Sequence, residues 1–320
     1  MKTPAALCCL ALLTALQPAA TAGLITEYTI LSPPDASYFG AAWVNGINNH
    51  NVAVATYAQG NGMITRGFLF NGTYATVDAP VNYVDAGPYI NGINDSGDYV
   101  GYWQTGPASG GTGFVHNDSG FTVITTPDGV NTNVRGINNA GTLAGTYFDN
   151  GLHGFIRNGQ TWTTLDHPDS TQDTMIFGIN NLGQVVGQYY GVDGLAHSFL
   201  WDGNTFTEIS ILDTATGTMA QGLNDNGDVV GYIYDTNGMS HGFLWNSGNW
   251  ITMDLAGFDV AGTSLLGINN YGSMVGQYID DSGIHSFMVT PEPGTALLGL
   301  LALLPLLFSF RRHSRRRHKN

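Results

Sequence analysis

Short apolar runs separated by turn-forming residues fill the middle of this chain. In one representative stretch the runs are 175–179, 184–190, 197–201 and 205–209, and the last of them alternates with polar residues. Runs of this kind, rich in Val, Ile, Tyr, Phe and Trp and bounded by Gly, Asn or Asp, are typical of β-strands joined by short turns. No segment between them has the period of an amphipathic helix. The pattern therefore predicts an all-β protein.

The same unit occurs six times, and each copy contains a Gly-Ile-Asn or Gly-Leu-Asn triplet followed later by a phenylalanine. The triplets begin at Gly46, Gly92, Gly136, Gly178, Gly222 and Gly267, and the phenylalanines are Phe68, Phe114, Phe155, Phe199, Phe243 and Phe287. Successive triplets lie 42 to 46 residues apart. Four strands in a unit of this length are typical of one β-propeller blade, so six copies predict a six-bladed ring.

The turn between the first two strands of each copy has its own signature. In the fourth copy it is Asn180-Asn181-Leu182-Gly183, and four other copies also place Gly at its last position. Glycine adopts a positive φ without strain, which suits a short hairpin loop. The first copy has Asn51 there instead, and Asn is the next best residue for that conformation.

The last copy lacks its fourth strand, because the strand that contains Phe287 runs directly into Pro291. The segment Leu24–Leu31 precedes the first copy and has no other role. We therefore expect a propeller of six four-stranded blades in which this N-terminal strand closes the last blade and removes exposed edges. A linear solenoid of β-units is the alternative.

The N-terminus has the three parts of a secretory signal peptide, which predicts processing of residues 1–22. Lys2 is the charged start, Ala5–Leu16 is the apolar stretch, and Ala20-Thr21-Ala22 is a small-residue cleavage site. Both cysteines lie inside this segment, so the mature protein is predicted to have neither disulfides nor thiol chemistry. Residues 23–290 form the predicted repeat domain.

The C-terminal segment, residues 291–320, has a different character. Pro291-Glu292-Pro293 is followed by the apolar run Thr295–Phe310 and then by a basic tail. The basic residues of this tail are Arg311, Arg312, Arg315, Arg316, Arg317 and Lys319. The positive-inside rule predicts that such a tail stays in the cytoplasm while the run anchors the protein in the membrane. A plain membrane anchor is the alternative to a processed one.

Two resemblances to bacterial families rest on these residues. The order of Pro291-Glu292-Pro293, apolar run and arginine cluster resembles the PEP-CTERM sorting signal, which implies processing by an exosortase-type enzyme and delivery to the cell surface or extracellular matrix. Residues 178–201 resemble the HAF-type extracellular repeat, Gly-Ile-Asn-Asn-x-Gly-x-Val-Val-Gly followed by His-x-Phe-Leu-Trp. The first two copies depart from it, with Arg66 and Thr112 in place of the histidine. This resemblance implies an exported repeat protein without known catalysis.

The repeat domain is strongly acidic. It contains three basic residues, Arg66, Arg135 and Arg157. Of the 24 Asp and Glu residues in the chain, only Glu292 lies outside the repeat domain, which leaves 23 inside it. The formal charge of the domain is therefore 3 − 23 = −20. Such a surface repels phosphate backbones, so nucleic acid is not an expected partner. The charge is interpreted as a source of solubility, with divalent cations as the alternative.

Four histidines recur two residues before the landmark phenylalanine. They are His153, His197, His241 and His285. Their equal spacing places one at the same point of each of four neighbouring copies, so they would converge on a metal only if that point lay at the central channel. We expect structural histidines bonded to a carbonyl or a turn, with a channel metal site as the alternative. The Asn/Asp-rich turns lack the acids of a calcium loop, so no metal or other cofactor is predicted.

The predicted function is non-enzymatic binding or scaffolding in the cell envelope or extracellular matrix, with extracellular polysaccharide or matrix components as partners. The alternative is a polysaccharide-acting hydrolase or lyase, which would need two converging acids that the sequence does not locate. No catalytic residues are assigned. The tryptophans lie mostly at strand positions and are expected to pack rather than to form a sugar platform; Trp103 is the best candidate for exposure because it borders a glycine-rich loop.

Overall fold

The computed structural model describes residues 21–33, 42–59, 64–78, 87–104, 111–126, 131–210, 217–256 and 262–291. Within these ranges all regular secondary structure is β-strand. The strands of the first three repeats are β3 (Ala42–Ile47), β4 (Ala53–Gln59), β5 (Ile64–Phe70), β6 (Tyr74–Val77), β7 (Pro88–Ile93), β8 (Tyr99–Gln104), β9 (Gly111–Asn117), β10 (Gly120–Ile124), β11 (Thr132–Ile137), β12 (Leu143–Phe148), β13 (Leu152–Asn158) and β14 (Thr161–Thr164). The last three repeats contain β15 (Thr174–Ile179), β16 (Val185–Tyr190), β17 (Ala196–Trp201), β18 (Phe206–Ile209), β19 (Gly217–Leu223), β20 (Val229–Tyr234), β21 (Ser240–Asn246), β22 (Asn249–Leu255), β23 (Gly262–Ile268), β24 (Met274–Asp280) and β25 (Gly283–Val289).

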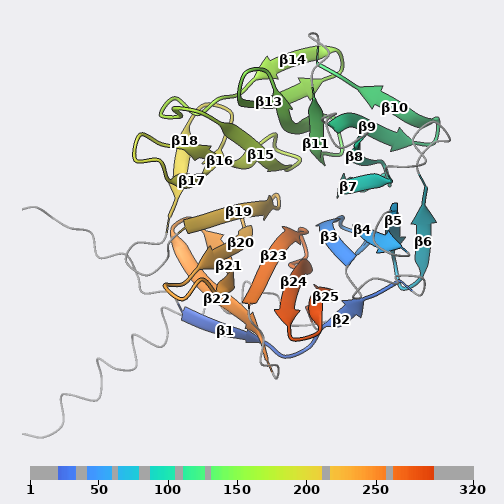
Figure 1. Cartoon of the computed structure of the whole chain (residues 1–320), viewed down its shortest axis with the longest axis vertical. Coiled ribbons are helices and arrows are strands. Elements are labelled where there is room, and N and C mark those ends of the chain that lie inside the picture. The colour runs from blue at the N-terminus through green and yellow to red at the C-terminus, as the bar shows by residue number, and fades with distance from the viewer. Residues whose placement is uncertain are drawn as a thin grey trace, which may run out of the picture.

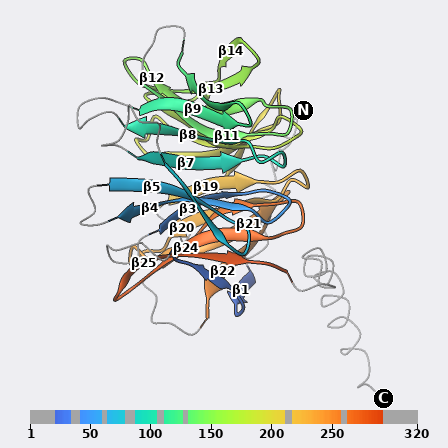
Figure 2. The same cartoon turned by 90° about the vertical axis from the view of Figure 1, so that its right-hand side faces the viewer.

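The sheets are arranged around a central axis as a β-propeller (Figure 1). Four of them are antiparallel and contain four strands each, namely β3–β6, β7–β10, β11–β14 and β15–β18. A further sheet has nine strands, β19–β25 together with two N-terminal strands. The first strand of each repeat lies innermost, and the later strands follow outwards (Figures 1 and 2). The predicted all-β propeller built from four-stranded sheets is therefore confirmed.

The N-terminal segment contributes two strands rather than one. β1 (Thr21–Ile25) pairs in parallel with β22, and β2 (Thr29–Leu31) pairs antiparallel with β25. The single strand expected over 24–31 is therefore wrong in its form, because only 29–31 pairs with the last repeat. The chain instead bridges two neighbouring repeats, and Leu31 is fully buried at the end of this bridge.

The landmark phenylalanines form the centres of the repeats. All six are at most 1% exposed, and Phe199 pairs across the sheet with Gly187 of the preceding strand. A Cβ on Gly187 would lie 2.7 Å from the Phe199 ring and 2.2 Å from the Met175 carbonyl oxygen. The glycine of the Val-Val-Gly motif therefore makes room for the buried ring.

The hairpin turns have the geometry that the sequence predicts. Gly97, Gly141, Gly183, Gly227 and Gly272 have φ angles between 76° and 88°, and Asn51 has 57° in the first copy. The first Asn of each turn also caps it, because the Asn180 side-chain oxygen accepts hydrogen bonds from the backbone amides of Leu182 and Gln184. The turn signature thus fixes where each innermost strand ends.

Two rings of hydrogen bonds join the innermost strands to one another. In the first ring, each triplet asparagine donates its side-chain amide to the carbonyl oxygen of the next one, over 2.9–3.3 Å, through Asn48, Asn94, Asn138, Asn180, Asn224 and Asn269. The second ring is formed by the residue after each triplet asparagine. Its backbone amide donates to the side-chain oxygen of the equivalent residue in the next repeat over 2.8–2.9 Å, through Asn49, Asp95, Asn139, Asn181, Asp225 and Asn270. Both rings close, because Asn269 and Asn270 bond to Asn48 and Asn49. The triplet asparagines therefore close the circle of inner strands.

The localisation expected from the sequence, with anchoring by a C-terminal membrane helix, needs correction. The described ranges contain no helix at all, and so none that is long and apolar enough to cross a membrane. The expectation rested on the run Thr295–Phe310, whose 16 residues fall short of the roughly 20 that span a bilayer and are interrupted by Pro305. That run, the basic tail, Glu292, Pro293 and residues 1–20 of the predicted signal peptide lie outside the described residues.

Candidate functional site

Each innermost strand contains a β-bulge at the residue directly before the triplet glycine. In β11, for example, Val134 pairs with Gly145 and Gly136 pairs with Ala144, which leaves Arg135 as the extra residue. A bulge leaves its extra residue unpaired and re-aims its side chain. The six extra residues are Asn45, Asn91, Arg135, Phe177, Gln221 and Leu266. We call them the bulge ring.

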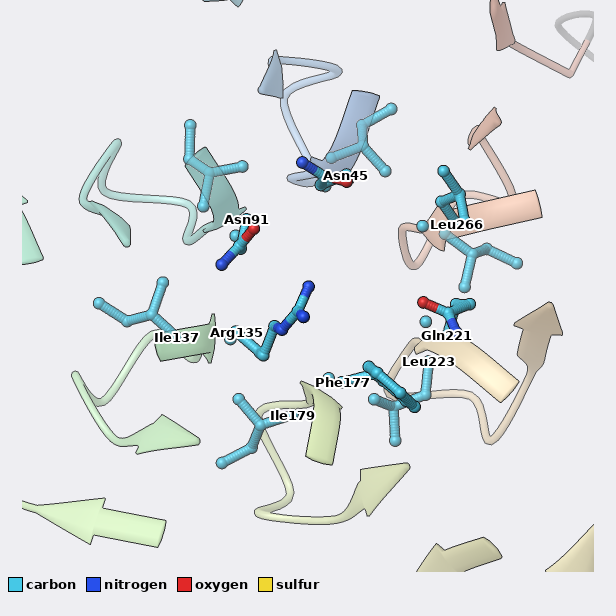
Figure 3. A pocket seen from close by; sticks show the side chains of 18 residues that line it. Asn45, Asn91, Arg135, Ile137, Phe177, Ile179, Gln221, Leu223 and Leu266 are labelled. Atoms are coloured by element: carbon cyan, nitrogen blue, oxygen red, sulfur yellow. The ribbon is translucent and has the colours of Figure 1, made fainter. Parts of the chain in front are cut away.

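The bulge ring surrounds one mouth of the central channel (Figure 3). Behind it the channel is lined by the triplet glycines and then by the triplet Ile and Leu residues. The glycines are needed there, since a Cβ on Gly222 would lie 2.8 Å from the Leu266 carbonyl oxygen. The triplet frame is thus nearly uniform, while the bulge ring combines three amides, one guanidinium and two apolar side chains.

Arg135 is the charged member of the bulge ring, and its side chain reaches towards the middle of the channel (Figure 3). Its Nε is buried without a hydrogen-bond partner, and the guanidinium carbon lies 5.7 Å from the centre of the Phe177 ring, within cation–π range. Burial lowers the pKa of Arg135. No Asp or Glu lines the channel mouth among the described residues. The charge of Arg135 is therefore uncompensated by the part of the protein that the structure describes.

A cavity of about 350 Å³ adjoins the mouth, because Arg135 and Phe177 line both. We call it the aromatic cavity; its lining is Tyr102, Gly111, Asn131, Thr132, Asn133, Arg135, Thr146, Tyr147, Phe148, Leu152, Met175 and Phe177. Phe148 is 47% exposed, and Tyr102 stacks on Tyr89 with ring centres 4.8 Å apart. Aromatic faces beside a few amide and hydroxyl groups are typical of small-molecule sites, which range over about 300–1,000 Å³.

The opposite end of the channel carries two carboxylates, but both are already bonded. One oxygen of Asp95 accepts from the Asn49 backbone amide, and the other accepts from the side chains of Asn49 and Asn139. Burial opposes the effect, yet these hydrogen bonds hold the pKa of Asp95 below its ordinary value. Asp225 is bound in the same way by Asn181 and Asn270. These acids thus serve the hydrogen-bond ring rather than an open site.

The repeated histidines lie away from the channel, each beside an acid. His197 bonds Asp193 through Nε2 and Glu208 through Nδ1 at 3.1–3.3 Å, and it stacks on Tyr189. His153, His241 and His285 pair with Asp166, Asp254 and Asp280. The expected hydrogen bond to a backbone carbonyl is found at His153, whose Nε2 lies 3.1 Å from the backbone carbonyl oxygen of Asp149. Within the described ranges no three His, Cys, Asp or Glu side chains gather as a metal site.

A second cavity, of about 440 Å³, lies between Trp245, Trp250 and Glu208. Among the described residues it contains one carboxylate and the aromatic cavity contains none, so the described lining of neither presents the pair of acids that a glycosidase of the usual kind needs. Trp103 lines neither cavity and is 1% exposed, stacked on Phe114 at 4.5 Å. Trp103, the best candidate for an exposed tryptophan, is therefore a packing residue, because its strand position buries it despite the neighbouring glycine-rich loop.

Sequence reasoning missed the bulge ring, although a signal was present. In a comparison of the six copies, the residue before the triplet glycine is Asn, Asn, Arg, Phe, Gln and Leu in turn, while the residues after it barely change. A variable position inside a constant frame indicates a place where the copies differ in function rather than in fold. From the sequence, Arg135 stands out only as one of the three basic residues of the domain.

No family model and no curated protein matches the sequence. Among solved structures, the lectin SapL1 in complex with α-methyl fucoside is similar, with a TM-score of 0.52 and 14% identity over 80% of this chain and 94% of that one. The fungal Aleuria aurantia lectin, described as six-bladed with a novel fucose recognition mode, has a TM-score of 0.49 and 10% identity over 80% of this chain and 93% of the lectin. At such identities the similarity to SapL1 shows a shared propeller fold.

Proposed function

We propose that this protein is a non-enzymatic carbohydrate-binding propeller whose ligand occupies the aromatic cavity and the adjoining channel mouth. The observation that carries the proposal is the lining of the aromatic cavity, which has aromatic walls at Tyr102, Tyr147 and Phe148 next to uncharged amides and hydroxyls. A sugar ring has apolar C–H faces that pack on aromatic rings and hydroxyls at its edge that hydrogen-bond. The lining offers both kinds of contact at once.

The described lining of the aromatic cavity favours binding over hydrolysis. General acid–base cleavage of a glycosidic bond uses two carboxyl groups, and none of the described residues that line the cavity is acidic. The similar propeller SapL1 was solved with a fucoside, which makes a sugar a reasonable ligand class for this scaffold. Fold similarity alone does not transfer a ligand, so the argument rests on the lining.

A glycan array tests the proposal with a matched pair of variants. Phe148→Ala removes an exposed wall of the aromatic cavity, whereas Tyr234→Ala removes the equivalent exposed aromatic of β20, which lines neither cavity. We expect the unmodified protein and Tyr234→Ala to bind the same glycans and Phe148→Ala to bind them about tenfold more weakly, since losing the apolar contact with one aromatic wall should cost on the order of 1.4 kcal/mol. Equal binding by both variants would place the ligand elsewhere.

We infer further that the ring has six blades. Six inner strands contribute to the two closed hydrogen-bond rings, which supports this count. The nine-stranded sheet divides into β19–β22 with β1 and β23–β25 with β2, because the link between β21 and β23 is a single bridge, Ser240–Gly262. In this interpretation β2 is the fourth strand of the last blade, and β1 adds a fifth to the blade before it.

We also propose that the protein is exported and processed by an exosortase-type enzyme at Pro291-Glu292-Pro293. This part of the proposal depends on the resemblance of the C-terminal segment to PEP-CTERM signals and of the repeats to HAF-type extracellular repeats. Mass spectrometry of the protein from its native host tests it. Processed protein should lack peptides from Arg311–Lys319, and their recovery on the mature extracellular form would contradict the proposal.

A further inference from the structure

We propose that the carbohydrate recognised here is acidic, and that Arg135 binds the carboxylate of a uronic acid at the channel mouth. The inference rests on the proposed carbohydrate-binding function and names the class of sugar. It starts from a difference within the bulge ring: five members are neutral, and one is a guanidinium in a domain with a formal charge of −20.

Arg135 differs from the other two cations of the domain in what it contacts. Arg66 forms an ion pair with Asp78, and Arg157 donates to Gln160 while it lies over Trp162. Arg157 also has a buried Nε without a hydrogen-bond partner, so Arg135 is set apart by its place at the channel mouth, with the Phe177 ring beside it and no acid among the described residues that line the mouth. A partly buried cation without a counter-charge destabilises the free protein, so a bound anion would supply what the fold leaves out.

The surroundings of Arg135 decide which anion fits. The guanidinium presents a planar set of donors that matches a carboxylate through two parallel hydrogen bonds. The aromatic cavity opens beside it, so a group bonded to Arg135 would continue into a hollow walled by Tyr147 and Phe148. A small inorganic ion would leave this hollow empty. A uronic acid carries a carboxylate on a ring of the kind that the aromatic walls accept.

Two neighbouring members of the bulge ring, Asn45 and Asn91, have side chains that are held in place by hydrogen bonds. Asn45 and Asn91 each donate their side-chain amide to the backbone of the next repeat, at Ile90 and Val134. Their side chains are therefore held in position at the mouth, and the Asn91 amide also bonds Asn133 of the aromatic cavity. A fixed rim around a single cation favours one orientation of a ligand, which is the preorganisation that specific binding needs.

The acidity of the whole domain opposes an anionic ligand at long range, and this gives a distinctive salt dependence. Screening over a Debye length of about 8 Å at physiological ionic strength weakens the repulsion from distant carboxylates more than it weakens a contact inside the mouth. Binding of an acidic sugar should therefore hold or improve between low and physiological salt. A sugar attracted by exposed surface cations would lose affinity over the same range.

Isothermal titration with matched ligands tests the proposal on the whole repeat domain as it is exported. The ligands are trisaccharides of galacturonate, glucuronate and mannuronate, each compared with its neutral methyl ester. The protein variants are Arg135→Gln, which installs the residue found at the equivalent position 221, and Arg157→Gln, which makes the same change in net charge away from the mouth. Arg135→Lys keeps the charge but loses the two-pronged geometry.

We expect at least one uronate trisaccharide to bind about tenfold to hundredfold more tightly than its ester, since a charge-assisted pair is lost in the ester. Arg135→Gln should abolish that preference, Arg135→Lys should reduce it, and Arg157→Gln should leave it unchanged. Equal binding of acid and ester, or a preference that survives Arg135→Gln, would overturn the inference while the carbohydrate-binding function stands. Binding of sulfated but not carboxylated sugars would also overturn it. If no sugar of any kind binds, the proposed function itself fails.

Discussion

At the scale of single residues, the unpaired charge of Arg135 should lower stability in the absence of ligand. We predict that Arg135→Gln raises the free energy of unfolding by about 1–2 kcal/mol, because it removes a partly buried charge whose Nε has no hydrogen-bond partner and that no acid among the described residues of the channel mouth balances. Urea denaturation of the ligand-free protein measures this. Arg157→Gln serves as the comparison and should bring no such gain, since it loses the bond to Gln160 and the contact with Trp162. A destabilised Arg135→Gln variant would mean that the guanidinium is part of the fold.

The acid-paired histidines give the stability a pH dependence of known sign. Burial lowers the pKa of His197, but its bonds to Asp193 and Glu208 outweigh this, so the folded pKa is raised. The stabilisation that charged His197 gives the folded state is therefore fully present below its unfolded-state pKa of about 6.5, and it is lost as pH rises through the folded-state pKa. We predict that His197→Gln destabilises the protein at about pH 5.5 by less than about 1 kcal/mol, and by a smaller amount at about pH 8.5. Urea titrations at the two pH values check this, and an equal effect at both would contradict it.

At the scale of structural elements, the hairpin asparagines join each inner strand to its neighbour. Asn180 is buried, its side chain caps its own turn, and it also donates to Gln184 and to the Asn224 carbonyl. We predict that Asn180→Ala lowers the free energy of unfolding by about 2–4 kcal/mol, because several buried groups lose their partners together. Asn204→Ala, at an exposed turn, is the control and should change stability by less than about 0.5 kcal/mol. Denaturant unfolding that fails to separate the two variants would show that the ring of asparagines is dispensable.

Sequence predicts the elements whose cause is local and misses those that depend on pairing. The turns, including Asn51, follow from residues adjacent in the chain, and so do the strands of the fourth repeat. A bulge appears only when two strands are in register, so no pattern within β11 alone reveals that Arg135 is the extra residue. The division of 24–31 into β1 and β2 likewise depends on which edges, β22 and β25, are open to receive them. The glycine-rich loop beside Trp103 likewise suggests exposure, whereas the strands around this residue bury it.

At the scale of the whole molecule, the N-terminal strands should act as a clasp between the last two repeats. Removal of residues 21–33 would uncover the edges of β22 and β25 and the core around Leu31 and Ile25. We predict a clear fall in melting temperature and a tendency to aggregate, because exposed strand edges pair with other chains and several apolar side chains lose burial. Scanning calorimetry with light scattering measures both effects. A melting curve that matches the full-length protein would contradict the role assigned to these strands in closing the ring.

The aromatic cavity beside the channel mouth exists only where neighbouring repeats are assembled, since its lining comes from β8, β9, β11, β12, β13 and β15 and from Asn131. The most direct test of its function is a crystal structure of the protein with the tightest-binding oligosaccharide from the glycan array. We predict a sugar ring against Phe148 and Tyr147 with its acidic group within hydrogen-bond distance of Arg135. A sugar found in the cavity between Trp245 and Trp250, or on the outer surface of the ring with the channel mouth empty, would contradict it.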